Sequence, residues 1–478
     1  MNHLSRGALM DVNPTFGVAL IALFVTLAGS ANVNADYKRC EHVVSNWASS
    51  AVAKVAKSDH HTLRDLLFFL HIPRTGGRAY YHCFLRKLYP DYEECPRSYD
   101  KLRFIPSKKD CKLLVTHDDY SIISKFPEER VSVVTILRNP VDRVLSSYEF
   151  SIEVAARFLV HPNLTSATQM SRRIRSKSDG VSTLDIWPWK HLVPWMREDL
   201  FHRREARAPN GLRNLKSSNP YDMKEIVMPL DDYLNDPLIL ENVHNGATLQ
   251  IAGLTNNSYS PEAHEVRHCI QTFGDLGEYV LKVAKKKLDN MLYVGLTENH
   301  KESASMFTRV VGSQVISQSV TSNPNLKKTA VNNSDSNIFY HKTDEDSETP
   351  DEFGKGNMTV GKLMDSYEDC IASLRKTQAK RRSASLRKIS PANFAKQDRL
   401  LVSESVIRKI QAFNNLDMEL YKHGVDLFAN QRMVKSTSFD YYLSPIYLKV
   451  LIFVTSLALF GIILLYLSAK SQTSKVKL

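Results

Sequence analysis

The sequence predicts an α/β fold in three layers, with a central, mainly parallel sheet flanked by helices. Short apolar runs at residues 66–72, 112–116 and 131–137 have the length and composition of buried parallel strands. The first and third runs are each followed by a segment with helical spacing of apolar residues. Strands and helices that alternate in this order form parallel sheets covered by helices.

The first strand, LLFFLHI, leads into the loop PRTGG (residues 73–77) and then into a helix over residues 78–88. This loop has what a phosphate cradle needs. Two glycines let backbone N–H groups approach anion oxygens, a threonine hydroxyl donates, and the start of a helix adds a favourable dipole. The pattern G-x-x-x-x-G-K-[ST] is absent, which disfavours a P-loop ATPase. Taken alone, Gly-Gly after a strand is equally compatible with a simple turn.

The third strand ends at Arg138 and is followed by a helix from 141 to about 158, which Asn139 caps and Pro140 begins. Ser146 lies two helical turns farther on and can face the same anion as Arg138. An Arg-Asn-Pro turn is also a common way to begin a helix. The prediction of this second anion site therefore depends on its combination with the first loop.

Arg74, His117 and Arg138 each follow the end of a predicted strand. Because ligands of parallel sheets bind at the carboxyl ends of the strands, these three distant segments are expected to meet in one crevice. A histidine titrates near neutral pH, which suits a general base at that edge. The alternative is a structural histidine that caps its strand.

The charge balance indicates an anionic partner. Lys and Arg total 63 against 51 Asp and Glu, which gives a formal net charge of +12. Basic and aromatic residues are not interleaved as in proteins that stack bases, and no zinc-finger or helix-turn-helix spacing occurs, so nucleic acid is not expected. A phosphorylated nucleotide is the better candidate.

Both ends of the chain carry address signals. An apolar run at 16–27, followed by small residues, is typical of a signal peptide over residues 1–35, with an uncleaved anchor as the alternative. The uncharged apolar stretch 450–467 predicts a transmembrane helix over residues 446–467, with a buried core helix as the alternative. The tail, residues 468–478, contains three lysines and no acid, which places it in the cytosol and the body of the protein in the lumen or outside.

Cysteines and sequons agree with that location. Six cysteines lie between the two apolar segments, and an even count in an oxidising compartment predicts up to three disulfides, whose pairing the sequence does not reveal. No cysteine or histidine cluster has zinc spacing, so no metal is expected. Four N-x-S/T sequons predict glycosylation at Asn163, Asn256, Asn332 and Asn357.

Composition divides the rest of the chain. Residues 36–311 are expected to form the luminal domain that contains the sheet. Residues 312–357 are rich in Ser, Asn, Thr and Asp and predict a disordered insertion. After a basic stretch at 376–388, helical spacing of apolar residues resumes, so residues 358–435 are expected to form a helical part that packs back on the domain.

The loop and the pattern R-x-P-x5-S together resemble the motifs of Golgi sulfotransferases. The stretches HIPRTGGR and LLVTHDDY are most similar to heparan sulfate 6-O-sulfotransferases. Residues 68–300, including HPNLTS, DIWPWKHLVPWMREDL and NGATLQIAGLTNN, resemble plant tyrosylprotein sulfotransferases more closely still, as does NNLDMELY at 414–421. The resemblance weakens across the insertion.

The resemblance implies a P-loop-like sulfotransferase fold and a protein-tyrosine sulfotransferase that uses 3'-phosphoadenylyl sulfate. It also implies a single-pass type I Golgi membrane protein with a luminal catalytic domain, acting on secreted peptide precursors whose tyrosines have acidic neighbours. The loop is implied to hold the 5'-phosphosulfate, and Arg138 with Ser146 the 3'-phosphate. The implied donor-binding residues are Pro73, Arg74, Thr75, Gly76, Gly77, Arg78, Arg138 and Ser146.

The resemblance also implies catalytic roles for two residues. His117 matches the histidine of the glycan enzymes' strand-end motif and is implied to be the general base. The sequence departs from the family pattern in the loop, where Arg74 replaces the usual lysine and Arg78 a threonine. Arginine keeps its charge and hydrogen bonds but does not donate its proton, so Arg74 is expected to stabilise the leaving phosphate by charge.

Two other functions stay open from the sequence. One is a glycan O-sulfotransferase of the heparan type, which would share the donor site, and the other is a non-catalytic, single-span binding protein. The segment with Trp187, Trp189 and Trp195 is as compatible with an acceptor groove as with core packing. Arg78 and Arg143 are equally compatible with binding substrate acids and with solvated helix faces. Residues 390–394 lie where related glycan enzymes contact the nucleotide.

Overall fold

The computed structural model describes most of the chain between residues 14 and 431. The described residues are 14–54, 61–95, 110–158, 161–163, 165–166, 169, 219–222, 228–237, 239–322, 358–386, 394–431, 453 and 455. The chain divides into two compact units, Met1–Gly424 and Val425–Leu478. All strands and labelled helices belong to the first unit. In the second unit, residues 425–431 are helical.

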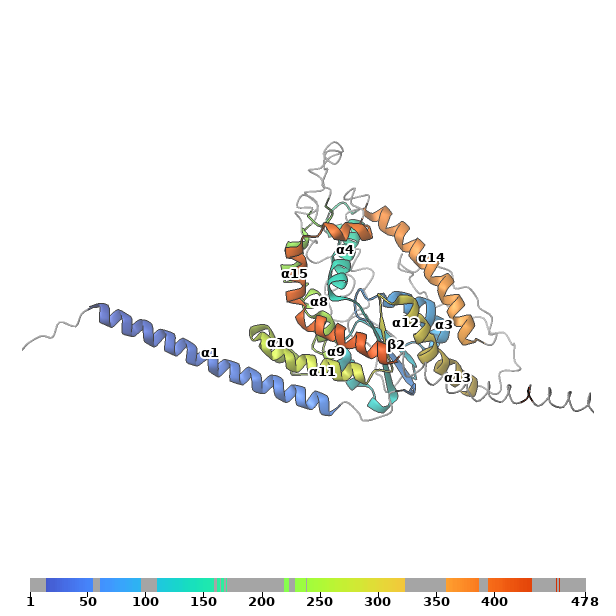
Figure 1. The fold of residues 1–478 in the computed structure, drawn as a ribbon, viewed down its shortest axis with the longest axis horizontal. Coiled ribbons are helices and arrows are strands. Elements are labelled where there is room, and N and C mark those ends of the chain that lie inside the picture. Colours follow the sequence, from blue (N-terminus) through green and yellow to red (C-terminus); the bar gives the residue numbers. More distant parts are fainter. Residues whose placement is uncertain are drawn as a thin grey trace, which may run out of the picture. The chain divides into compact units, whose positions relative to one another are not determined.

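A sheet of four parallel strands forms the centre of the first unit (Figure 1). Its strands, in the order β2-β1-β3-β4, are β1 (Leu66–Leu70), β2 (Leu113–Thr116), β3 (Val131–Leu137) and β4 (Tyr293–Leu296). Every residue of these strands is buried, as is typical of a parallel sheet covered on both faces. The predicted α/β class, with a central parallel sheet flanked by helices, is confirmed.

The strand order creates a switch point between β1 and β3. From β1 the chain passes to β2 on one side, whereas from β3 it passes to β4 on the other side. The connections that leave the carboxyl ends of β1 and β3 therefore diverge. Ligands of open parallel sheets bind at such switch points.

The helix predicted after β1 is present but divided. It consists of α2 (Gly77–Tyr80), the π-helical turn η1 (Tyr81–Leu85) and α3 (Arg86–Leu88). Six of its residues are buried, so the segment packs its apolar face inward. They are Gly77, Tyr80, Tyr81, Cys83, Phe84 and Leu85.

The helix predicted after β3 is α4 (Pro140–Phe158), and it begins as the sequence indicates. The Asn139 side-chain oxygen accepts hydrogen bonds from the backbone N–H groups of Val141 at 3.0 Å and Asp142 at 3.4 Å. Asn139 is thus the N-cap, and Pro140, which has no N–H to satisfy, is the first helical residue.

Strand β4 is absent from the sequence-based prediction. Its residues, YVGL, continue the apolar pair Met291-Leu292, but an internal glycine interrupts the run. The glycine is needed for close approach: a Cβ at Gly295 would lie 2.7 Å from the Cδ1 atom of Ile136 in β3.

Helices and short turns make up the rest of the first unit. Between α4 and the C-terminal helices lie α7 (Leu230–Asn235), α8 (Leu240–Val243), α9 (Gly246–Ala252), α10 (Ala263–Thr272), α11 (Gly277–Asp289), α12 (His300–Phe307), the π-helical turn η10 (Thr308–Gly312) and α13 (Ser313–Ser322). The 3-10 turns are η2 (Asp91–Glu93), η4 (Tyr120–Lys125), η5 (Glu128–Arg130), η9 (Gly274–Leu276) and η11 (Lys396–Leu401). Helices α14 (Val360–Leu386) and α15 (Glu404–Phe413) pack on α4, and residues 415–424 are also helical.

The predicted disordered insertion, residues 312–357, is wrong at its start. Residues 313–322 form α13, and polar side chains tie this helix to the segment before β1. The Gln314 side-chain oxygen accepts from the Leu63 N–H at 2.7 Å, and the Gln318 amide donates to the Leu63 carbonyl at 2.8 Å. A polar composition there serves tertiary hydrogen bonds. Residues 323–357 lie outside the described residues.

All six cysteines form disulfides, as many as the sequence allows: Cys40–Cys269, Cys83–Cys370 and Cys95–Cys111. The first joins the N-terminal helix to α10, and the second joins η1 to α14. Segments that are hundreds of residues apart are thereby fixed around the sheet.

The structure describes more of the predicted signal peptide than of the predicted transmembrane segment. Helix α1 (Pro14–Ala53) runs through the predicted end of the signal peptide at Ala35, and its later turns pack on α10 and α11. The predicted transmembrane segment, residues 446–467, lies outside the described residues apart from Phe453 and Thr455. Within the described part of the chain, no helix combines the length and the apolar character that a membrane crossing requires.

Candidate functional site

The loop after β1 is a tight turn at the carboxyl edge of the sheet. Arg74 and Gly76 have left-handed backbones, with φ of +69° and +83°. A Cβ at Gly77 would lie 2.4 Å from the His71 ring. The buried Thr75 hydroxyl donates to the Ile72 carbonyl at 2.9 Å and closes the turn. The two glycines are therefore required by the loop's geometry.

The end of β4 holds this loop in place. The Thr297 hydroxyl lies 2.6 Å from the Thr75 carbonyl oxygen and 3.0 Å from the Leu137 carbonyl oxygen. It bridges the loop to the end of β3, across the switch point. Sequence reasoning misses Thr297 because it misses β4.

Of the three residues expected to meet at the carboxyl edge, Arg74 and Arg138 are in contact at the switch point, together with Ser146. One guanidinium nitrogen of Arg138 donates to the Arg74 carbonyl at 3.0 Å. The Nε and Nη2 atoms of Arg74 donate to the Ser146 hydroxyl at 3.1 and 3.0 Å, and its guanidinium lies over the Phe150 ring, 4.4 Å from the centroid. The side chains assigned to opposite ends of the nucleotide thus contact each other. Their roles toward a ligand stay predictions.

The electrostatics of these arginines favour a bound anion. Burial, together with the nearby charge of Arg138, lowers the pKa of Arg74 to about 10. Burial and the charge of Arg399 lower the pKa of Arg138. The hydrogen bonds of Arg74 and Arg138 go to a hydroxyl and a carbonyl, which are neutral groups. An anion beside them would relieve the repulsion between partly buried cations.

A neighbouring pair of arginines is already paired with two carboxylates of α4, Glu149 and Asp142. The buried Glu149 carboxylate accepts from Arg399 at 2.9 and 3.2 Å and from Arg382 at 3.3 Å. Burial alone would lower the pKa of Arg399, but its hydrogen bonds to Glu149 raise it instead. The sequence gives no signal for Arg399, and it marks Arg382 only as part of a basic stretch.

His117 is held in one tautomer at the end of β2. Its Nδ1 atom lies 2.7 Å from the His71 carbonyl oxygen, and because a carbonyl only accepts, Nδ1 carries the proton. Nε2 is then the basic nitrogen of the neutral ring. The two histidine rings lie 4.2 Å apart between centroids, so His71 limits how the His117 ring can turn.

Gln250 of α9 ties together the strand ends that carry the histidines. Its amide nitrogen lies 3.0 Å from the His117 carbonyl oxygen, 3.3 Å from that of His71 and 3.4 Å from that of Asp118. Gln250 itself is buried, which strengthens its hydrogen bonds to these backbone groups. The sequence reasoning passes over this residue, which lies inside the stretch NGATLQIAGLTNN.

Arg143 lies in neither of the two places considered from the sequence. It is buried and pairs with the buried Asp417, with 2.8 Å between the nitrogen and the oxygen. A second nitrogen donates to the Asn242 carbonyl at 2.7 Å. Arg143 therefore joins α4 to the C-terminal helices, and it does not lie on a solvated face. Arg78 is half buried on α2, and Pro73 is buried in the loop.

Several other predicted features are only partly described. The segment with Trp187, Trp189 and Trp195 lies outside the described residues. Of residues 390–394 only Phe394 is described, and it packs in the core against Tyr148 and Tyr221.

The structure describes two of the four predicted glycosylation sites. Asn163 and Asn256 are exposed, and the Asn256 amide donates to Glu241 at 2.8 Å. Asn332 and Asn357 lie outside the described residues. Among the residues whose placement is described, no group of three or more His, Cys, Asp or Glu could hold a metal ion.

The structure defines an α/β protein with a parallel sheet whose switch point holds two arginines and a glycine loop, an edge suited to an anion. No protein-family model matches the chain. The chain is 54% identical over 439 residues to a protein-tyrosine sulfotransferase of Arabidopsis thaliana, covering 89% of this chain and 88% of that protein. The chain therefore belongs to the protein-tyrosine sulfotransferase family. The resemblance noted from the motifs is confirmed.

Proposed function

We propose that the protein transfers the sulfuryl group of 3'-phosphoadenylyl sulfate to tyrosine hydroxyls of secreted peptides and proteins. The observation that carries the proposal is the 54% identity to a protein-tyrosine sulfotransferase over most of both chains. The arginines at the switch point support it, since a donor with phosphate at both ends of a nucleoside needs cationic groups at a sheet edge.

The donor fits the switch point. The 5'-phosphosulfate would lie on the loop of residues 73–78, where the backbone turns left-handed at Arg74 and Gly76. The 3'-phosphate would lie beside Arg138 and Ser146, both of which contact Arg74 of the loop. In this arrangement the fold is that of the sulfotransferases, with the loop in the place of a nucleotide-binding P-loop.

The reaction is an in-line displacement at sulfur. The tyrosine oxygen forms a bond to sulfur as the bond from sulfur to the 5'-phosphate oxygen breaks, and His117 Nε2 takes the phenol proton. The products are tyrosine O-sulfate and adenosine 3',5'-bisphosphate. Protonation of His117 strengthens its Nδ1–H bond to the His71 carbonyl, so the cation is stabilised where it forms.

Arg74 stabilises the leaving group by charge. Its pKa of about 10 lies well above neutrality, so the guanidinium stays protonated throughout the reaction. Its contact with Ser146 gives way to the phosphosulfate when the donor binds, because a doubly charged anion is the stronger partner.

The predicted location belongs to the same proposal. The protein would enter the secretory pathway through its N-terminal signal and remain in the Golgi membrane as a type I protein, anchored by residues 446–467. Three disulfides support an oxidising compartment. The exposure of Asn163 and Asn256 is compatible with glycosylation there.

The test is sulfate incorporation from labelled donor into defined acceptors. The purified protein is expected to label a peptide with tyrosine between aspartates, and not the same peptide with phenylalanine in that place. Labelling of a heparan-type oligosaccharide instead of the peptide would replace the proposal by a glycan sulfotransferase. Tight nucleotide binding without transfer to either acceptor would indicate a non-catalytic binding protein.

A further inference from the structure

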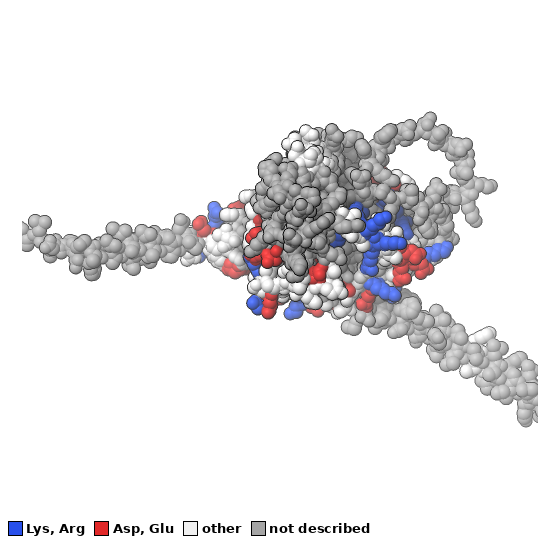
Figure 2. Space-filling view, turned by 90° about the horizontal axis from the view of Figure 1, so that it is seen from above, with Lys and Arg blue, Asp and Glu red and all other residues white. Residues whose placement is uncertain are grey.

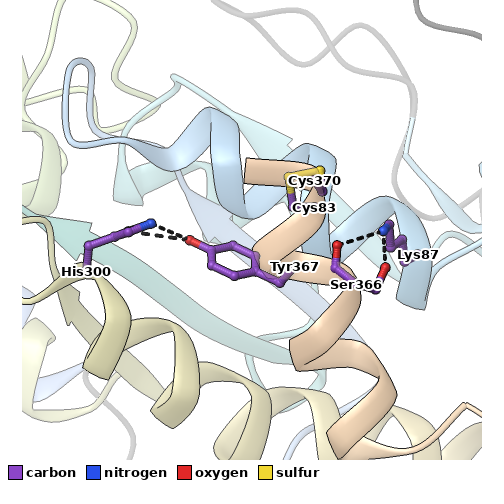
Figure 3. The surroundings of a disulfide bond; sticks show 6 residues. All are labelled: Cys83, Lys87, His300, Ser366, Tyr367 and Cys370. Carbon is purple, nitrogen blue, oxygen red and sulfur yellow. Dashed lines mark hydrogen bonds between the residues drawn. A yellow bond between two sulfur atoms is a disulfide. The ribbon is translucent and has the colours of Figure 1, made fainter. Parts of the chain in front are cut away.

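Helix α14 has a first anchor on η1, the segment that follows the donor loop. Cys370 forms a disulfide with Cys83, which lies six residues after Gly77 (Figure 3). The Tyr367 ring stacks on Phe84 with 4.0 Å between centroids, and the Tyr367 hydroxyl lies 2.9 Å from the His300 ring. These contacts fix the helix against η1, the segment that follows the loop.

A second anchor lies about three turns later. Arg382 of α14 donates to Glu149 at 3.3 Å, and Glu149 is one turn beyond Ser146 on α4. Residues 370–382 therefore run from the helix behind the loop to the helix that carries Ser146. At 1.5 Å per residue this stretch is about 18 Å long, and its ends contact η1, which follows the donor loop, and α4, which carries Ser146.

The charges of α14 are divided along its length. Its acidic residues, Asp365, Glu368 and Asp369, all precede Cys370, whereas residues 371–386 contain five cations and no acid. We call residues 375–382 the basic segment of α14; its cations are Arg375, Lys376, Lys380, Arg381 and Arg382.

Much of the basic segment faces solvent. Arg375, Lys376 and Lys380 are exposed, whereas Arg382 is partly buried against Glu149. Viewed from the side on which α14 lies in Figure 1, the domain carries a run of Lys and Arg side chains next to a group of acidic ones (Figure 2). Exposed cations in a row attract anionic partners and suit neither core packing nor an intramolecular pair.

We propose that the basic segment of α14 binds the acidic residues that flank the acceptor tyrosine. The inference rests on the proposed function and adds the place where the acceptor docks. Its length suits the partner: residues 375–382 span about 10 Å at about 1.5 Å per residue, which accommodates about three residues of extended peptide at about 3.3 Å each. An acidic flank bound there keeps the tyrosine close to the switch point, because Arg382 at the end of the segment is anchored to Glu149, one turn beyond Ser146 on α4.

The test compares a triple variant, Arg375→Gln, Lys376→Gln and Lys380→Gln, with the unchanged protein. Arg382 is left intact because it holds Glu149. A control variant, Lys54→Gln, Lys282→Gln and Lys286→Gln, removes the same charge from exposed positions on α11 and the end of α1. Two acceptor peptides are used, one with aspartates around the tyrosine and one with asparagines.

The triple variant is expected to raise KM for the aspartate peptide about tenfold and to have little effect on the asparagine peptide or on KM for the donor. The increase should shrink at high salt, since exposed charges are screened. The control variant should leave both peptides unchanged.

Three results would overturn the inference. The first is an unchanged KM for the aspartate peptide in the triple variant, and the second is an equal change for both peptides. The third is loss of binding to a heparan-type glycan with unchanged peptide kinetics, which would assign the segment to a glycan. If the unchanged protein sulfates neither peptide, the proposed function itself fails, so the two failures are distinguishable.

Discussion

Replacing Asp417 with alanine is expected to destabilise the first unit strongly. Its buried carboxylate pairs with Arg143 at 2.8 Å and accepts from the N–H and hydroxyl of Thr248, both at 2.7 Å, and from the Ala247 N–H at 3.2 Å. Ala247 and Thr248 lie in the first turn of α9, so the carboxylate also caps that helix.

The magnitude follows from what the substitution leaves behind. Breaking a buried ion pair by removing one partner costs about 3–5 kcal/mol, because the remaining charge is uncompensated. The side chains of Arg143 and Asp417 are 3% and 1% exposed, so water cannot replace the carboxylate without rearrangement. The orphaned N–H groups of α9 place the expected loss near the upper end, at about 5 kcal/mol.

The measurement is urea unfolding followed by circular dichroism. With a slope of about 3 kcal/mol per molar urea, this loss lowers the midpoint by about 1–2 M. Glu419→Ala is the matched control, two residues away. Its carboxylate lies 3.9 Å from Lys285, with side-chain exposures of 54% and 33%, so a change below about 1 kcal/mol is expected.

Equal midpoints for the two variants would refute the reasoning. An unchanged midpoint for Asp417→Ala combined with weaker binding of acidic peptides would return Arg143 to the substrate-binding role considered from the sequence. Arg143→Met tests the pair from its other side and should also lower the midpoint.

Three further predictions concern the site and its surroundings. Gly77→Ala should raise KM for the donor, because the added Cβ would lie 2.4 Å from the His71 ring. The control Gly274→Ala, whose Cβ would have no atom within 4 Å, should leave this KM unchanged. Equal kinetics for both variants would contradict a phosphate-binding loop at residues 73–77. Gln250→Leu should lower kcat about tenfold, the cost of about one buried hydrogen bond, with donor affinity unchanged, and an unaltered kcat would remove Gln250 from the positioning of His117. Stability should fall as the pH drops below about 6.5, because burial lowers the pKa of His300 in the folded state and the unfolded state takes up the proton first. Thermal unfolding at pH 7.5 and 5.5 should show a smaller loss of stability in His300→Gln than in the unchanged protein. An equal loss in both would contradict this prediction.

The sheet is predictable where its strands are uniform. β1, β2 and β3 are apolar runs bounded by polar residues, and the order of strands and helices along the chain defines the class. β4 is missed because an internal glycine interrupts its apolar run. The start of the insertion is misread because Gln314 and Gln318 make hydrogen bonds that a composition argument treats as solvation.

The site is predictable where residues follow a strand directly. Arg74, His117 and Arg138 meet this condition, since parallel strands bring their carboxyl ends to one edge. Thr297 and Gln250 do not stand out, because their partners lie 222 and 133 residues away in the chain. The sequence likewise does not distinguish the buried Arg143 from a surface arginine, because its partner, Asp417, is also distant in the chain.

Calorimetric titration with adenosine 3',5'-bisphosphate tests most directly whether the ends of β1 and β3 hold one nucleotide. Arg138 follows the carboxyl end of β3, and Arg130 precedes the amino end of the same strand, where it pairs with Asp65 at 3.2 Å. Arg138→Ala is expected to raise Kd about 10–100-fold, the loss of a hydrogen bond to a charged group, and Arg130→Ala to leave it unchanged. Equal dissociation constants for the two variants would contradict a nucleotide site at the switch point.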